Sequence, residues 1–220
     1  MGQTSFNNKI VSITIPASLK DIAAYDGENS LASQSLSEIK VSASNPVFSS
    51  KNGILFNKDG TKLICYPLGK PDTTYNVPNG VVEIGNNAFA GCPSITNIII
   101  PATLKKIGKY AFTECRELNK VSISEGCTTI ANNAFYRCSA LGTIDLPVSV
   151  ASIEQNAFYG CESLTDVYYA GTKIDRSLIV ISDGNTTLAT ATWHYTETEP
   201  EESPTDSPTP TPTPTATPAP

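Results

Sequence analysis

Four of the six cysteines recur at a constant interval of 23 residues, at positions 92, 115, 138 and 161. Thiols in such an array could form disulfides, hold a metal ion or act as nucleophiles. Stacked copies would place neighbouring thiols about 4.8 Å apart on parallel Cα–Cβ bonds, whereas a disulfide needs Cβ atoms about 3.5–4.5 Å apart. The chain has no Cys-x-x-Cys pair, and His194 is its single histidine, so it offers neither a metal ligand set nor a base for a thiol. We therefore predict six free thiols, no metal ion, no cofactor and no catalytic residues.

The cysteine is one position of a longer repeat that must place it in the fold. Each copy reads Ala-Phe-x-x-Cys followed by Leu-x-x-Val-x-Ile or close variants, again at intervals of 23 residues. Such a period is typical of stacked units that cannot bury their apolar faces alone. We predict that the phenylalanines and cysteines form two columns in a shared core, a structural ladder made of Phe89, Phe112, Phe135, Phe158, Cys92, Cys115, Cys138 and Cys161.

The apolar residues after each cysteine are spaced two apart, as in Ile98 and Ile100 or Ile144 and Leu146. This is the period of a β-strand with one buried face, and successive units would place such strands side by side and parallel. The Ala-Phe-x-x-Cys segment is too short for a regular α-helix and predicts a 3₁₀ or single helical turn. Each 23-residue coil is thus predicted to contain one parallel β-strand and one short helical turn.

These motifs resemble the leucine-rich repeats of BspA-like bacterial surface proteins, also called the Treponema pallidum type. Residues 78–92 match that repeat almost residue for residue, through Val81, Ile84, Gly85, Ala88-Phe89 and Cys92. The resemblance implies a β-rich leucine-rich-repeat solenoid with a horseshoe-like superhelix. It also implies an extracellular or cell-surface location in a bacterium, and we expect that a signal peptide, absent from this chain, has been removed.

Composition divides the chain into a lead-in, one folded unit and a tail. The tail alternates Pro and Thr and has no apolar side chain larger than Ala, so we expect a disordered linker. It carries five of the 21 acidic residues and no basic one, which leaves 16 acids against 15 bases elsewhere. A nearly neutral solenoid argues against nucleic-acid binding, and no apolar run is long enough for membrane insertion. The boundaries are 1–9, 10–196 and 197–220.

Within the folded unit, both ends depart from the repeat. The N-terminal coils are degenerate, and residues 45–70 insert a hairpin in which two apolar runs flank the turn at Asn57-Lys58-Asp59-Gly60. Regular repeats occupy 75–170, and residues 171–196 predict a cap. In that cap we expect one last strand in place of a full coil, with a structural role for His194.

Outward-facing residues between the buried strand positions would form rows across the solenoid. Aromatic and charged side chains together are typical of protein-binding patches, so these rows are the candidate binding surface. Its predicted members are Asn97, Ile99, Lys120, Ser122, Thr143, Asp145, Asp166 and Tyr168.

The sequence favours a non-catalytic secreted or cell-surface binding module that acts as a monomer. The resemblance implies a protein ligand, either a host matrix protein or another bacterial surface protein, and a role in adhesion. One alternative is a glycan-binding accessory module of a secreted multidomain polysaccharide-degrading protein. Tyr136 and Tyr159 would support that alternative if they face solvent. A structural spacer without a ligand is the other.

Overall fold

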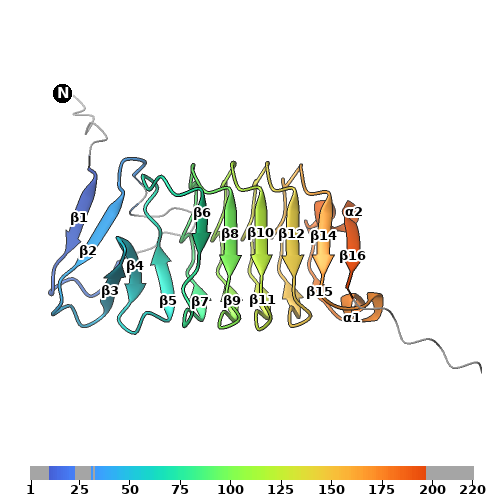
Figure 1. Cartoon of the computed structure of the whole chain (residues 1–220), viewed down its shortest axis with the longest axis horizontal. Coiled ribbons are helices and arrows are strands. Elements are labelled where there is room, and N and C mark those ends of the chain that lie inside the picture. The colour runs from blue at the N-terminus through green and yellow to red at the C-terminus, as the bar shows by residue number, and fades with distance from the viewer. Residues whose placement is uncertain (1–9, 23–30, 32, 197–220) are drawn as a thin grey trace, which may run out of the picture.

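The chain winds into a solenoid whose strands lie side by side along its length (Figure 1). The computed structural model describes residues 10–22, 31 and 33–196. The predicted lead-in 1–9 and linker 197–220 lie outside the described residues, as do positions 23–30 and 32 of the degenerate first coils. The predicted parallel solenoid is confirmed over the regular repeats.

One sheet, here called the long sheet, contains the strands predicted from the period-two pattern. Its six strands are all parallel, and each strand pairs with the equivalent strand of the neighbouring coil. Buried residues alternate with more exposed ones along the central strands, because only one face of the sheet is packed against the core. The strands are β6 (Thr74–Asn76), β8 (Asn97–Ile100), β10 (Lys120–Ile123), β12 (Thr143–Leu146), β14 (Asp166–Tyr169) and β16 (Thr192–Tyr195).

Each regular coil also contains a second strand, which the sequence analysis did not anticipate. These strands are only two residues long, too short to leave a periodic signal of their own, and they form a second parallel stack here called the short sheet. One residue of each inner pair is the fully buried Ile before the turn. The strands are β7 (Glu83–Ile84), β9 (Lys106–Ile107), β11 (Thr129–Ile130), β13 (Ser152–Ile153) and β15 (Val180–Ile181).

The Ala-Phe-x-x-Cys segments form consecutive turns instead of a 3₁₀ helix. In one coil, the N–H of Thr113 donates to the carbonyl of Tyr110 at 3.1 Å, and the N–H of Cys115 donates to that of Phe112 at 3.2 Å. These are bonds of the 3₁₀ type, but Tyr110 and Glu114 both have φ of +56°. A left-handed residue interrupts helical dihedrals, so the turns cannot join into a helix.

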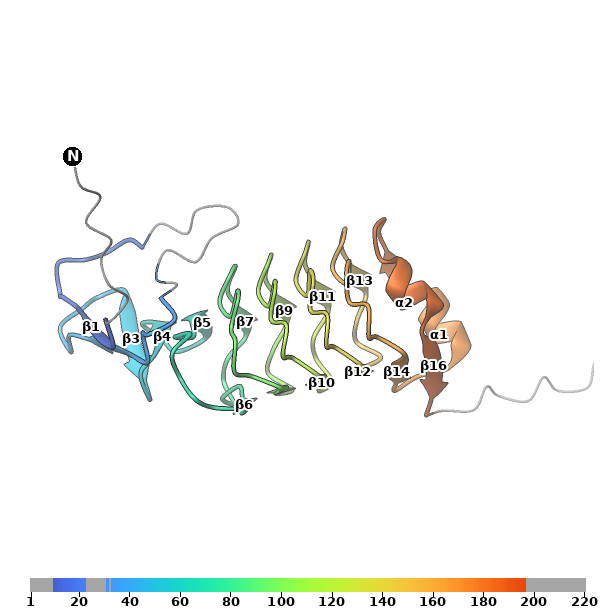
Figure 2. The same ribbon diagram turned by 90° about the horizontal axis from the view of Figure 1, so that it is seen from above.

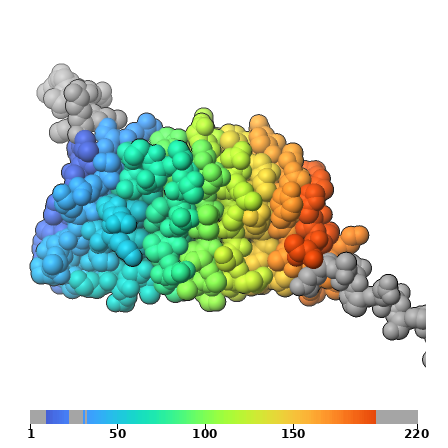
Figure 3. All heavy atoms as spheres, viewed as in Figure 1, coloured from blue at the N-terminus to red at the C-terminus, as the bar shows by residue number. Residues whose placement is uncertain are grey.

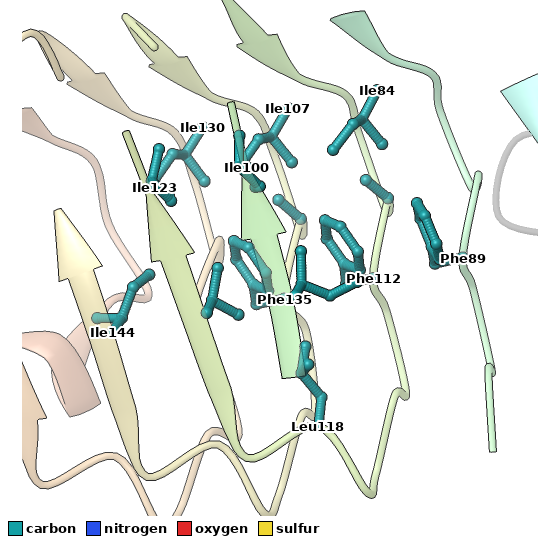
Figure 4. Packing of buried hydrophobic residues seen from close by; sticks show 14 of the residues in the cluster. Ile84, Phe89, Ile100, Ile107, Phe112, Leu118, Ile123, Ile130, Phe135 and Ile144 are labelled. Carbon is teal, nitrogen blue, oxygen red and sulfur yellow. The ribbon is translucent and has the colours of Figure 1, made fainter. Parts of the chain in front are cut away.

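The predicted phenylalanine column is confirmed. Successive rings stack with nearly parallel planes. The centroid distances are 4.8 Å from Phe89 to Phe112, 5.0 Å from Phe112 to Phe135 and 5.1 Å from Phe135 to Phe158. Figure 4 shows the first three rings in one row beside the isoleucines of both sheets. The column is extended by Tyr66, whose ring stacks on Phe89 at 4.9 Å. Because each ring packs against the ring of the next coil, the coils share one continuous core.

The N-terminal part has a smaller core of its own. Strands β1 (Ser12–Ile15) and β2 (Glu38–Val41) pair in parallel, while β3 (Phe48–Lys51), β4 (Ile54–Asn57) and β5 (Lys62–Cys65) pair antiparallel. The predicted hairpin is therefore confirmed, with one additional strand. Strand β5 pairs with β7 and joins this region to the short sheet. The separate core contains Ile15, Leu36, Ile39, Phe48, Leu55 and Cys65.

The C-terminal cap is a complete coil, so the prediction of a single last strand is wrong. It contributes β15 to the short sheet and β16 to the long sheet. Helices α1 (Lys173–Ser177) and α2 (Thr186–Thr190) replace two of the usual turns, as Figure 2 shows at the last coil. The repeat motif is missing here because helices, not Ala-Phe-x-x-Cys turns, connect the strands.

Candidate functional site on the long sheet

The outward-facing residues of the long sheet form the two rows expected from the repeat. One row contains Asn97, Lys120, Thr143 and Asp166, and the other contains Ile99, Ser122, Asp145 and Tyr168, each opposite its neighbour. Strand β16 extends these rows with Thr192 and His194. The ten residues are called the strand face below. Figure 3 shows this side of the molecule as a broad surface without a deep cleft.

A polar cluster surrounds Asp145 in the middle of the strand face. Its Oδ2 atom accepts a hydrogen bond from the Ser122 hydroxyl at 2.6 Å, and the Nζ atom of Lys120 lies 3.2 Å from the same oxygen. Ser122 comes from the same row, whereas Lys120 reaches across from the other. All three side chains are half-exposed, so solvent screens the ion pair and it contributes little to stability. Its main effect is to fix the position of the Asp145 carboxylate.

An aromatic cluster lies at the C-terminal end of the strand face. The rings of Tyr168 and His194 stack with centroids 4.5 Å apart and planes 16° apart. The Nε2 atom of His194 lies 2.7 Å from Oδ1 of Asp166, and the Thr165 hydroxyl donates to Oδ2 at 2.7 Å. The hydrogen bonds from His194 and Thr165 lower the pKa of the Asp166 carboxyl. This corner therefore holds an ionised carboxylate beside two stacked rings.

Sequence reasoning missed His194 as a member of this surface. The available signal was the alternation in Trp193-His194-Tyr195, which places the histidine on the opposite side of the strand from its two aromatic neighbours. Only the pairing of β16 with β14 places His194 opposite Tyr168.

The second row, from β8 to β14, places two polar side chains between two exposed apolar or aromatic ones. Exposed Ile99 and Tyr168, the latter 45% exposed, stand at its two ends, and the shorter Ser122 and Asp145 lie between them. Strands lie about 4.8 Å apart, so three spacings separate the end residues by roughly 14 Å. This part of the row therefore presents an apolar side chain and an aromatic side chain with a carboxylate between them.

A second aromatic pair lies on the turns that follow the buried phenylalanines. The rings of Tyr136 and Tyr159 stack 5.4 Å apart, and the guanidinium of Arg137 lies 5.1 Å from the Tyr136 centroid. Tyr159 is 47% exposed. Since Tyr136 covers one face of the Tyr159 ring, its other face, edge and hydroxyl account for this exposure.

The cysteines are structural. None of the six is joined in a disulfide, and all are buried. Burial raises the pKa of Cys127 to about 11 and also raises the pKa of Cys138. A buried thiol held in its neutral form is neither a nucleophile nor a metal ligand. Within the described residues, no group of three or more His, Cys, Asp and Glu side chains is placed to hold a metal ion.

Comparison with protein families identifies the repeat. Residues 71–179 match the model of the BspA type leucine rich repeat region, in six copies. The chain belongs to the BspA-type leucine-rich repeat family. The repeats of this family are therefore the units that build both sheets and the strand face, and such proteins are typical of bacterial cell surfaces.

Solved structures share the fold. The pneumococcal vaccine antigen PcpA is 24% identical with a TM-score of 0.69, over 86% of this chain and 46% of that one. A leucine rich cell surface protein from Faecalibacterium prausnitzii is 26% identical with a TM-score of 0.57, over 78% and 51% respectively. The T. pallidum leucine rich repeat protein is 29% identical with a TM-score of 0.50, over 57% of each chain. This BspA-type chain thus spans about half the length of these proteins.

A comparison with curated proteins finds no match. Neither α1 nor α2, the two helices of the described part of the chain, is long and apolar enough to cross a membrane.

Proposed function

We propose that this BspA-type chain is a non-catalytic binding module at a bacterial surface and that it engages a protein ligand through the strand face. The observation that carries the proposal is the arrangement of the second row, in which the exposed side chains of Ile99 and Tyr168 flank the polar pair Ser122 and Asp145. Protein-binding hot spots combine an aromatic anchor with apolar and charged neighbours in this way.

The rigidity of the strand face supports the same conclusion. Its side chains stand on hydrogen-bonded strands, and Tyr168 and Asp145 are each held by neighbouring side chains. A surface that is ordered before binding loses little conformational entropy when the ligand arrives. The family relationship and the Pro/Thr composition of residues 197–220 fit a module held away from the cell envelope.

The test uses the purified chain on a biosensor against a panel of extracellular-matrix proteins. Tyr168→Ala should weaken binding to any captured protein by about tenfold or more, the loss typical of an aromatic hot spot. Tyr159→Ala is the matched control, because Tyr159 is equally exposed and also stacks on a neighbour but lies on the turns. Equal affinity of the Tyr168→Ala variant and the native chain would reject the strand face as the binding surface.

The stacked pair of exposed Tyr159 and partly buried Tyr136 favours one second candidate, a glycan-binding module. The free face of an exposed tyrosine can pack against the apolar face of a sugar ring, and Arg137 supplies a donor beside the pair. A glycan array tests this candidate with the same two variants. Polysaccharide binding that is lost in Tyr159→Ala and kept in Tyr168→Ala would support it. Binding of proteins without binding of any glycan would reject the glycan-binding candidate.

A further inference from the structure

The last coil seals one part of the core and leaves another part open. Leu188 of α2 is fully buried and belongs to the same core cluster as the phenylalanine column. At the short sheet there is no such cover. Ile181 lies opposite Ile153 in the register, yet Ile153 is fully buried while Ile181 is 37% exposed. The same residue type is exposed because no further strand lies against β15 among the described residues.

The outward row of the short sheet also changes character at this end. From β7 to β13 it contains Glu83, Lys106, Thr129 and Ser152, and in β15 it ends in an exposed valine, Val180. Terminal coils of soluble solenoids normally present a polar outer face. A valine at this position is therefore unexpected for an end that faces water.

Helix α1 enlarges the apolar area. It buries none of its own residues, and Ile174 and Leu178, one helical turn apart, are both exposed, Leu178 by 73%. Leu178 and exposed Val148 line the same cavity of about 140 Å³. We define the end patch as Val148, Ile174, Leu178, Val180 and Ile181. Exposed apolar side chains gathered at one end of a solenoid in this way mark an interaction surface.

Two candidate covers within the chain do not match the end patch. Residues 197–220 contain no aromatic side chain and no Val, Leu, Ile or Met, so they offer no large apolar side chain to match the end patch. At the opposite end of the short sheet, β3 exposes Ser50 and Lys51, so head-to-tail stacking would place a lysine against valine and isoleucine. The surface that does match is a second end patch, because it is equally apolar.

We propose that two copies of the chain associate through their end patches about a two-fold axis, with β15 of one copy antiparallel to β15 of the other. The N–H groups of Val180 and Ser182 donate to β13, so the N–H of Ile181 between them points to the open edge. A two-fold axis pairs such edges reciprocally and closes the assembly at a dimer. The solenoid is nearly neutral, so charge repulsion between two copies is small. The proposed dimer differs from the monomer expected from sequence.

The first test is the molar mass of the purified chain by light scattering over about 1–500 µM. The mass should rise with concentration from 23.4 kDa toward twice that value. Val180→Lys should weaken the dimer by at least about tenfold, since it buries a charge at the interface. The outward row of the short sheet tolerates lysine, because Lys106 occupies it in β9. Thr129→Lys in β11 is therefore the matched control, and it should leave the dimer intact. A mass that stays at one chain throughout, or a dimer unaffected by Val180→Lys, would overturn the proposal.

The second test separates two-fold from head-to-tail association. All native cysteines are buried, so Ile181→Cys introduces the one exposed thiol among the described residues. Near a two-fold axis this thiol meets its own copy, and mild oxidation should give a disulfide-linked dimer much faster than for Thr129→Cys. Equal rates for the two variants would exclude β15 pairing about a two-fold axis.

Discussion

The thiol of Cys138 donates a hydrogen bond to the carbonyl oxygen of Phe112 in the preceding coil, with 3.0 Å between sulfur and oxygen. Cys115 and Cys161 make the same bond to Phe89 and Phe135. The cysteine column is thus a ladder of hydrogen bonds between coils as well as a column of small apolar side chains. In the last coil, the hydroxyl of Thr187 takes the place of the thiol and bonds to the carbonyl of Phe158 at 2.7 Å.

This ladder predicts that two buried cysteines respond differently to the same substitution. Cys138→Val should cost about 1–3 kcal/mol of unfolding free energy, because it removes the bond to Phe112 and adds bulk to a packed site. Cys127→Val should cost less than about 1 kcal/mol, because the Cys127 thiol makes only a longer bond of 3.8 Å to the Thr129 carbonyl and valine already occupies that repeat position at 81 and 150. Urea unfolding of the two variants measures the difference. Equal losses would mean that the thiol bonds contribute nothing.

The end of the phenylalanine column predicts a strong effect at Asn185. Its Oδ1 accepts from the N–H of Phe158 at 2.9 Å, as the carbonyl of Ala157 does for Phe135. Its Nδ2 donates to the carbonyls of Glu154 and Ser182. Asn185→Ala leaves the buried N–H of Phe158 without this partner, removes the bonds to two less buried carbonyls, and should cost about 2–4 kcal/mol.

The loss in Asn185→Ala should begin at the C-terminal coil. Hydrogen exchange should therefore show earlier opening of β14 and β16 than of β8. Asn76→Ala, at an exposed position of β6, is the control and should change neither stability nor exchange. Uniform acceleration along the solenoid would contradict a local capping role.

The left-handed residues predict a stabilising substitution. Glu114 has φ of +56°, and the equivalent positions in two other coils are Gly91 and Gly160. Glu114→Gly should stabilise the chain by about 0.5–1 kcal/mol, because glycine adopts this conformation without a Cβ clash. Glu114→Ala removes the same exposed ion pairs with Arg116 and Arg137 but keeps the Cβ, so it should not stabilise. Thermal unfolding compares the two variants, and equal midpoints would exclude strain as the cause.

The hydrogen bonds to Asp166 predict a pH effect on stability. Because the folded-state pKa of Asp166 is lowered, the folded chain binds fewer protons there than the unfolded chain at mildly acidic pH. This contribution is present above the ordinary carboxyl pKa of about 4 and is lost as pH falls through the lowered value. Asp166→Asn should therefore be less stable than the native chain at pH 7, with a difference that narrows on acidification.

His194→Phe provides the matched control for this pH effect. The phenylalanine keeps a ring for stacking on Tyr168 but cannot donate a hydrogen bond to Asp166. The stability difference between His194→Phe and the native chain should therefore also narrow as the pH falls. Thermal melting across the acidic range makes the measurement. A difference in stability between His194→Phe and the native chain that stays constant with pH would show that the hydrogen bond from His194 does not contribute to this pH effect.

Much of the fold and the whole predicted part of the candidate site follow from the 23-residue period. A fixed interval places the same residue type at the same point of every coil, so Phe135 over Phe112, and Asp145 beside Tyr168, can be predicted without coordinates. The hairpin at Asn57 to Gly60 follows from local turn chemistry in the same way.

The sequence alone determined the columns and rows, because repetition converts spacing along the chain into position in space. Tertiary structure alone decided the features that depend on neighbours outside the motif. Two-residue strands exist only through their pairing, so the short sheet had no pattern to reveal it. His194 joins the strand face only because β16 pairs with β14. Ile153 and Ile181 are the same residue type in the same register, and burial separates them only because one has a following coil and the other does not.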